Sequence, residues 1–193
     1  MAYLDRIKAR LDELHFIPPK GLKPCTEEEV VRLEQARSVK LPQAYREFLL
    51  WMGSSGGSLF IGSDCFYRDL PLIQKGAVEL LEEDQFPLKL PEDAFVFYMH
   101  QGYNFDFFRP SEGDDPPVYY YLEDSEQTSF TEVFSHYSDA LLAWIENEAK
   151  VTASLAESWK QGRRPAVPEI QRSVEYYLEG LQLREQDRRN RDE

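Results

Sequence analysis

The stretch Leu41-Pro42-Gln43-Ala44-Tyr45-Arg46-Glu47-Phe48-Leu49-Leu50 carries the clearest local signal in the chain. Pro42 fits the first turn of an α-helix, where its missing N–H costs no hydrogen bond. Gly53 lies where a C-terminal cap would end this helix. The apolar residues between them recur at helical spacing and predict one buried face: Tyr45, Phe48, Leu49 and Met52.

Two further helices are predicted before this one. Thr26-Glu27-Glu28-Glu29 is a capping box, in which the Thr26 hydroxyl accepts from the Glu29 amide and the Glu29 carboxylate reaches back. Residues 2–14 have one apolar stripe at helical spacing, so they predict a short amphipathic helix. Pro18-Pro19 ends that helix and begins a linker.

After the loop at residues 54–57 the chain is predicted to consist mainly of strands and turns. Ser58–Ile61 is strand-like, and three stronger strand candidates follow: Phe95–Met99, Tyr103–Phe108 and Val118–Leu122. A capping box at Ser129-Phe130-Thr131-Glu132 predicts the start of a longer helix. A last helix is predicted around residues 168–183.

Helices that precede a run of strands indicate an α+β fold. We expect a central, mostly antiparallel sheet with helices packed beside it, plus a C-terminal helical extension. The predicted parts are an N-terminal helix and linker (1–23), an α+β domain (24–149) and a C-terminal helical extension with a frayed end (150–193).

The net charge of −13 is confined to one part of the sequence. Residues 51–150 carry five basic and nineteen acidic side chains, a balance of −14, whereas residues 1–50 carry +1 and residues 151–193 carry zero. Such an excess repels phosphates, so direct nucleic-acid binding is not expected. The confined charge suits either a solvated surface or an electrostatic surface for a basic partner.

Cysteine usage and hydropathy favour a cytoplasmic protein. Cys25 and Cys65 form no CxxC pair and cannot make a disulfide scaffold. The start of the chain has no signal-peptide pattern, and no apolar run approaches the length needed to cross a membrane.

Motifs for catalysis and metal binding are weak. Gly53-Ser54-Ser55-Gly56-Gly57 matches G-x-S-x-G, but a nucleophile elbow needs a strand before the serine and a helix after it, and here that order is reversed. His15, His100 and His136 form no close ligand pair. We therefore expect no catalytic residues, no metal and no cofactor, and keep a hydrolase using Ser55 or paired acids only as a remote alternative.

Acidic and tyrosine side chains gather around two predicted strands and their turns. One interpretation is a solvated surface patch, without a binding role, above an aromatic core. The alternative is a surface for a protein partner, because tyrosines supply contact area at small entropic cost. The candidate partner-binding residues are Tyr103, Asp106, Asp114, Asp115, Tyr119, Tyr121, Glu123, Asp124 and Glu126.

The helix at residues 41–50, with Gly56-Gly57 after it, resembles the LP-x-x-Y-x-x-FL and G-G signature of the SUKH superfamily. The later strands and closing helix resemble that family in the same order, so the likeness covers about residues 24–149. The family includes fungal cell-wall assembly regulators and bacterial immunity proteins that neutralise toxins. The resemblance implies a structural role, in helix start and core, for Leu41, Pro42, Tyr45, Phe48 and Leu49.

The resemblance also implies a non-catalytic protein that binds a toxin, often a nuclease. Nuclease toxins carry basic clefts for phosphates, which agrees with the acidic block in residues 51–150. The alternative is a regulatory scaffold that binds several cellular proteins and uses the C-terminal helices as a docking element. A monomer and a homodimer are both compatible with the sequence.

Overall fold

The computed structural model describes residues 2–14 and 21–192 of the chain. The predicted linker at Pro18-Pro19 and His15 lie outside the described residues. The helices are α1 (Asp5–Leu14), α2 (Glu27–Arg37), α3 (Gln43–Met52), α4 (Leu70–Glu83), α5 (Tyr137–Lys160) and α6 (Pro168–Asp192), with a 3-10 turn η2 (Pro110–Glu112). The strands are β1 (Leu22–Lys23), β2 (Ser55–Gly56), β3 (Ser63–Asp64), β4 (Phe95–His100), β5 (Asn104–Phe108), β6 (Val118–Leu122) and β7 (Thr131–Phe134).

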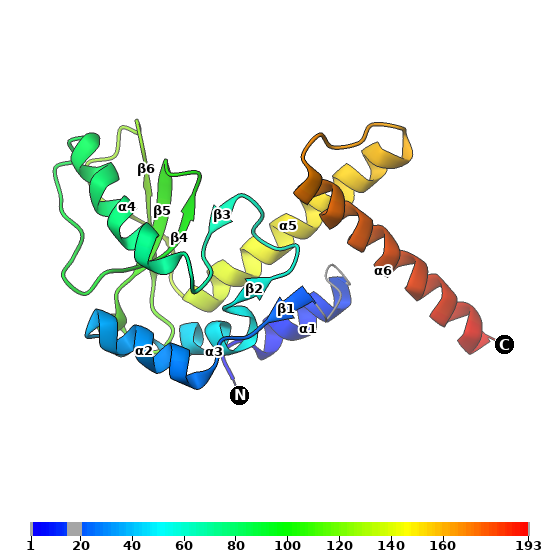
Figure 1. The fold of residues 1–193 in the computed structure, drawn as a ribbon, viewed down its shortest axis with the longest axis horizontal. Coiled ribbons are helices and arrows are strands. Elements are labelled where there is room, and N and C mark those ends of the chain that lie inside the picture. The colour runs from blue at the N-terminus through cyan, green and yellow to red at the C-terminus, as the bar shows by residue number, and fades with distance from the viewer. Residues whose placement is uncertain (1, 15–20, 193) are drawn as a thin grey trace.

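The main sheet is antiparallel throughout, in the order β3-β4-β5-β6-β7, and a second small sheet pairs β1 with β2. The α+β prediction is therefore confirmed. Strands β4 and β5 pair in a register that places Phe95 opposite Phe108 and Tyr98 opposite Asp106. Figure 1 shows the sheet with α4 lying across one side of it.

One face of the sheet, called here the α5 face, carries Phe95, Phe97 and Phe108 and packs against α3 and α5. Tyr45 of α3 is fully buried, and its ring centroid lies 5.1 Å from that of Phe108 in an edge-on contact. Tyr137 at the start of α5 meets Tyr45 at 5.5 Å and 89°. The predicted apolar face of α3 is thus the centre of an aromatic core.

The structure explains the residues that begin α3 and the glycine that follows it. Leu41, Phe48 and Leu49 are buried, and Pro42 is the N-cap of α3. Gly57 has φ +66, and a Cβ there would lie 3.1 Å from the Cα of Gly21. A glycine at this position lets the loop after α3 approach the segment leading into β1.

Helix α4 covers the opposite face, called here the α4 face, and no sequence pattern had predicted it. Its apolar residues Ile73, Ala77, Leu80 and Leu81 are buried, and Pro71 lies in its first turn. Gln74 reaches the edge of β4, where its Oε1 accepts from the Val96 amide at 3.3 Å and its Nε2 donates to the Val96 carbonyl. The prediction of only strands and turns in this region was wrong.

Two smaller predictions also fail. Ser58–Ile61 forms turns, and the strand lies slightly later, at β3. The pattern at Ser129–Glu132 does not begin a helix, because residues 131–134 form the edge strand β7 and pair with β6. The β-branched and aromatic residues of this segment suit a pleated edge, and α5 begins only at Tyr137.

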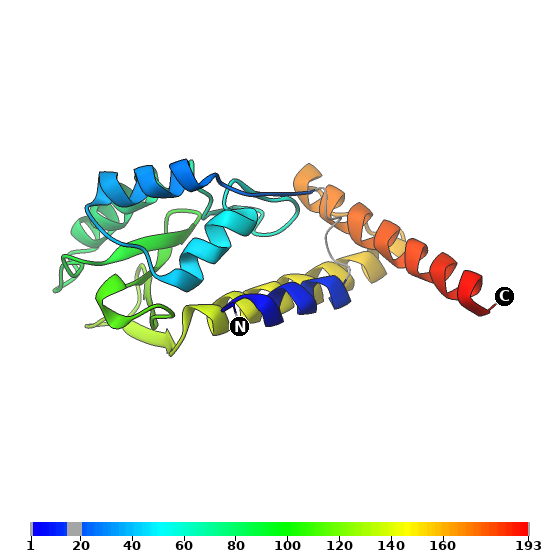
Figure 2. The ribbon, with the colours of Figure 1, turned by 90° about the horizontal axis from the view of Figure 1, so that it is seen from below.

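The helix at residues 2–14 and the closing helices pack together. Leu4, directly before α1, and Ile7 and Leu11 of α1 are buried in the main core cluster, and Arg10 pairs with Glu146 of α5 at 2.9 Å. Helix α5 continues without a break through residues 149 and 150, so the predicted domain boundary falls inside it. Figure 2 shows α1 alongside α5, and α6 extending from the far end of α5.

Candidate functional site

The structure distributes the predicted acidic residues over three places. Asp114 and Asp115 precede β6, whereas Glu123, Asp124 and Glu126 follow it. At about 3.3 Å per residue, the ends of this strand lie roughly 15 Å apart. Asp106 is in β5 and is only 4% exposed. The acidic residues predicted as one partner surface therefore do not form one patch.

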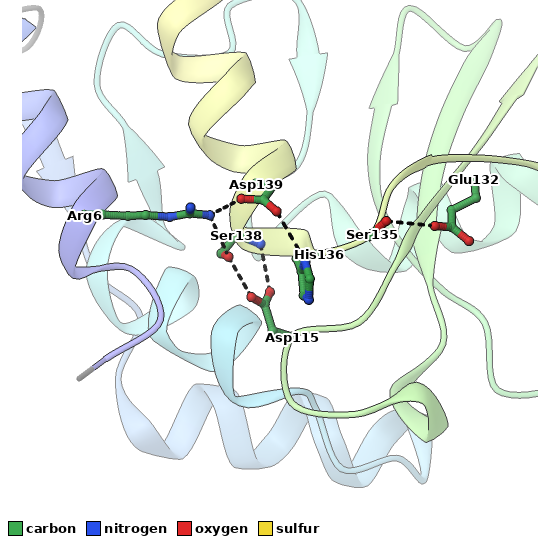
Figure 3. A network of polar contacts seen from close by, with 7 residues as sticks. All are labelled: Arg6, Asp115, Glu132, Ser135, His136, Ser138 and Asp139. Atoms are coloured by element: carbon green, nitrogen blue, oxygen red, sulfur yellow. Dashed lines mark hydrogen bonds and ion pairs between the residues drawn. The ribbon is translucent and has the colours of Figure 1, made fainter.

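Asp115 organises the start of α5. Its carboxylate accepts from the amide of Ser138 at 2.8 Å and from the Ser138 hydroxyl at 2.6 Å. Arg6 of α1 donates to Ser138 and pairs with Asp139, which also lies 3.3 Å from His136 (Figure 3). Through these contacts Asp115 holds the first turn of α5 in place over the sheet. Asp114 is exposed, and its carbonyl accepts from the amide of Ala44 at 2.9 Å.

An acidic edge forms where the C-terminus of α4 meets the segment after β6. The Tyr121 hydroxyl donates to the carboxylate of Asp84, and the nearby Asp84, Glu123 and Asp124 help to raise the pKa of Tyr121, after burial as the main cause. The structure describes no ion pair for these carboxylates. We define the acidic edge as Glu82, Glu83, Asp84, Glu123, Asp124 and Glu126.

The predicted tyrosines differ in accessibility. Tyr103 is 39% exposed in the turn between β4 and β5. Tyr119 is half-buried, and its hydroxyl donates to Glu112 at 3.1 Å. Tyr121 is buried, because its ring stacks on Phe105 and is covered by Phe86. Placing Tyr121 and Asp106 on an exposed partner surface was therefore wrong, since both side chains are inside the fold.

Asp106 belongs to what we call the inner polar cluster, made of Tyr98, Asn104, Asp106, Tyr120 and Glu148. The register places Tyr98 and Tyr120 on either side of Asp106 across neighbouring strands, so all three point to the α5 face. Burial raises the pKa of Asp106 to about 8, and no cation faces its carboxylate in the described chain. Burial also raises the pKa of Glu148, which lies one helical turn after Trp144.

A serine and a histidine meet beside this cluster. Ser63 Oγ lies 2.8 Å from both the Tyr98 hydroxyl and His100 Nδ1. In a serine hydrolase triad a third group orients the histidine; within residues 2–14 and 21–192 His100 forms no ion pair with a carboxylate, and Asp64 interacts with it only through its charge. Ser55 is likewise occupied, since its hydroxyl accepts from the Gly57 amide at 3.2 Å.

The other groups weighed for chemistry are separated or buried. A cleft of about 180 Å³ between α2 and β4 contains no histidine, and Asp93 there pairs with Arg109 at 2.9 Å. Burial raises the pKa of Cys25 to about 11 and that of Cys65 well above its usual range. In the described part of the chain no three His, Cys, Asp or Glu side chains are grouped to hold a metal ion. None of its helices is both long and apolar enough to cross a bilayer.

The antiparallel sheet with helices on both faces forms a small α+β domain. The chain belongs to the SMI1 / KNR4 family (SUKH-1), whose family model matches residues 24–143. This confirms the resemblance seen in the sequence. A comparison with curated proteins gave no match. The matched part ends within α5, so α1, the remainder of α5 and α6 lie outside it.

Proposed function

We propose that this chain is a non-catalytic immunity protein that binds and neutralises a basic toxin domain through its acidic edge. The observation that carries the proposal is the meeting of two acidic segments, residues 82–84 and 123–126, at one end of the sheet. Both are far apart in the sequence, and the Tyr121 hydroxyl holds them together.

Carboxylates without a cationic partner among the described residues leave a negative field that attracts a basic surface and speeds association. A nuclease toxin is basic where it holds phosphates, so a bound acidic edge would cover that cleft. Membership of the SUKH-1 family supports this assignment, because the resemblance implies immunity proteins among its bacterial members.

Charge reversal at the edge tests the proposal. The test variant combines Glu123→Lys with Glu126→Lys and leaves Asp124 in place, because Asp124 has φ +54, a left-handed conformation that aspartate adopts more readily than lysine. The matched control combines Glu175→Lys with Glu179→Lys on exposed positions of α6. Partners are captured from the native host on the unaltered chain and identified.

We expect the captured partner to be a basic toxin whose expression arrests growth, and the chain to restore growth. The test variant should lose this protection and associate at least tenfold more slowly at low salt, while the control keeps both. A captured partner that is not toxic, or equal protection by both variants, would reject the proposal.

A scaffold role is the second candidate, and the helices outside the family match favour it. Tyr176 and Leu183 on α6 are 42% and 57% exposed, so this helix presents apolar side chains to solvent. If α6 is the docking element, Tyr176→Asp with Leu183→Asp abolishes partner capture and charge reversal at the acidic edge does not. The immunity proposal expects the opposite pattern.

A further inference from the structure

The inner polar cluster holds two neighbouring hydrogen-bond acceptors that lack a donor. Asp106 is 4% exposed and Asn104 is 9% exposed, and both point to the α5 face because they are two residues apart in β5. The buried Asn104 Oδ1 has no hydrogen-bond partner among the residues described. The Asp106 carboxyl, although flanked by Tyr98 and Tyr120, has neither a hydrogen bond nor a nearby cation among the described residues. Most buried polar atoms in proteins have a partner, so this pair indicates a site that receives donors from another molecule.

Aromatic rings form the walls of the site. The Tyr98 ring stacks on Trp144 of α5, with centroids 5.2 Å apart and planes at 24°. Tyr120 is the cross-strand neighbour of Asp106 on its other side. Burial is the main cause of the raised pKa of both tyrosines, and the Asp106 charge adds to it, so their hydroxyls stay protonated. When Asp106 is ionised, above its pKa of about 8, its charge attracts a cation and the aromatic ring faces add to that attraction.

The site borders solvent on the side of β6 and β7. Tyr120 and Leu122 are half-buried on the same face, and Thr131, the partner of Tyr120 in β7, is exposed. Tyr103 is exposed in the adjoining turn, where its ring meets that of His100 at 5.6 Å. A long side chain that contacted Asp106 would enter from this edge, past Tyr120 and Leu122, because α5 covers the other end of the sheet.

We propose that the inner polar cluster is a receptor for a single arginine side chain of the bound protein partner, with Asp106 and Asn104 as acceptors and Tyr98, Trp144 and Tyr120 as walls. A guanidinium is planar and stacks on aromatic rings, while its five N–H groups serve a carboxylate and an amide oxygen together. A lysine ammonium fits less well because it cannot stack. A metal ion fits less well because the described residues offer no three-ligand group.

This inference rests on the proposed function for the source of the arginine, and it deepens it. The acidic edge and the inner polar cluster lie at the same end of β6, because Asn104 is the cross-strand partner of Leu122, which directly precedes Glu123. A basic partner attracted by the edge would thus carry an arginine past the opening of the site.

The test uses a small probe, so it does not require the partner. N-acetyl-arginine methylamide is titrated into the intact chain, with N-acetyl-citrulline methylamide as the uncharged probe of matching shape. The titration is run at about pH 8.5, above the pKa of Asp106, where the carboxylate is charged. We expect the backbone amide NMR chemical shifts of residues 104, 106 and 120 to change saturably with the arginine probe and not with the citrulline probe.

Two variants locate the binding. Asp106→Asn keeps the shape of the side chain and removes its charge, so we expect at least a tenfold loss of probe affinity. The acidic edge is altered by Glu123→Lys with Glu126→Lys. This variant should keep probe affinity within about threefold, because solvent and salt screen the effect of exposed charges on the site. Near-ultraviolet circular dichroism checks that both variants keep the native aromatic packing.

The outcomes separate the two proposals. Equal binding of both probes, equal affinity in Asp106→Asn, or no saturable shift at these three residues would overturn the arginine site. Loss of toxin protection in the acidic-edge variant together with an absent probe site would leave the proposed function standing alone. Binding of the arginine probe to a chain that captures no toxin would support the arginine site and reject the proposed function.

Discussion

The side chain of Gln74 pairs with both polar groups of the Val96 backbone, as a neighbouring strand would. Gln74 lies on α4, and its amide satisfies the N–H and the carbonyl of Val96 where the short strand β3 does not reach. Arg37 of α2 donates in turn to Gln74 Oε1 at 2.9 Å. One glutamine thus closes an edge of the sheet and joins it to two helices.

Replacing this glutamine should be costly. Gln74→Leu leaves a buried donor and a buried acceptor on Val96 without partners, and each such group costs about 1–3 kcal/mol. We expect the free energy of unfolding to fall by about 2–4 kcal/mol in chemical denaturation. Lys75→Leu, at an exposed neighbouring position, is the control and should change stability little. Similar losses in both variants would mean that the backbone pairing does not matter.

The buried Asp106 should make stability depend on pH. Its pKa is about 8 in the fold and near 4 when unfolded, so between these values the folded state binds one more proton than the unfolded state. Its contribution to stability therefore falls as pH rises from about 4 to 8, by about 1.4 kcal/mol per pH unit. Asp106→Asn should remove this slope, and its advantage over the unaltered chain should be greatest above pH 8. Parallel curves of unfolding free energy against pH would contradict the assignment.

The hydroxyl of Tyr45 should be dispensable for folding. It is buried, and no hydrogen-bond partner for it is found in the described part of the chain. Because a buried hydroxyl without a partner costs about 1–3 kcal/mol, Tyr45→Phe should raise the free energy of unfolding by about 1 kcal/mol. Tyr45→Ala should lower it by about 3–5 kcal/mol, since it removes a ring that packs against Phe95, Phe108 and Tyr137. A loss of stability in Tyr45→Phe would show that the hydroxyl is used.

Helix α1 should be an integral part of the domain through its apolar face. Ile7 is fully buried, so Ile7→Ala should cost about 2–4 kcal/mol. Arg6 and Asp139 are 52% and 43% exposed, and solvent screens their ion pair. Arg6→Ala should therefore cost about 1 kcal/mol or less. If Ile7→Ala leaves the unfolding midpoint unchanged while α1 detaches, the helix is an accessory rather than part of the core.

Local signals predicted the elements whose hydrogen bonds are made within a few residues. The capping box at Thr26 is present, with Glu29 N to Thr26 Oγ1 at 3.2 Å and Thr26 N to Glu29 Oε2 at 2.8 Å. The similar pattern at Ser129–Glu132 failed because β6 offers its edge to residues 131–134. Pairing with the preceding strand, which ends at Leu122, decided this segment, and the pattern at Ser129–Glu132 contains no signal of that pairing.

The acidic residues show the same limit at the functional site. In the segment Asn104-Phe105-Asp106-Phe107-Phe108 the alternation of a strand places Asp106 on the same face as Phe108. Phe108 is in the core, so this spacing was a signal that Asp106 points inward and not to the surface. Composition alone treated Asp106 and Asp124 as equivalent, whereas the alternation within the strand and the register of the sheet separate them.

The unbroken course of α5 has a mechanical consequence. A helix of 24 residues is about 36 Å long and behaves as a stiff rod, since bending it would break its own hydrogen bonds. Trp144 and Glu148 belong to the same helix that carries α6 at its C-terminal end. A displacement of α6 that tilts α5 would therefore also shift the Trp144 ring against Tyr98 of the inner polar cluster.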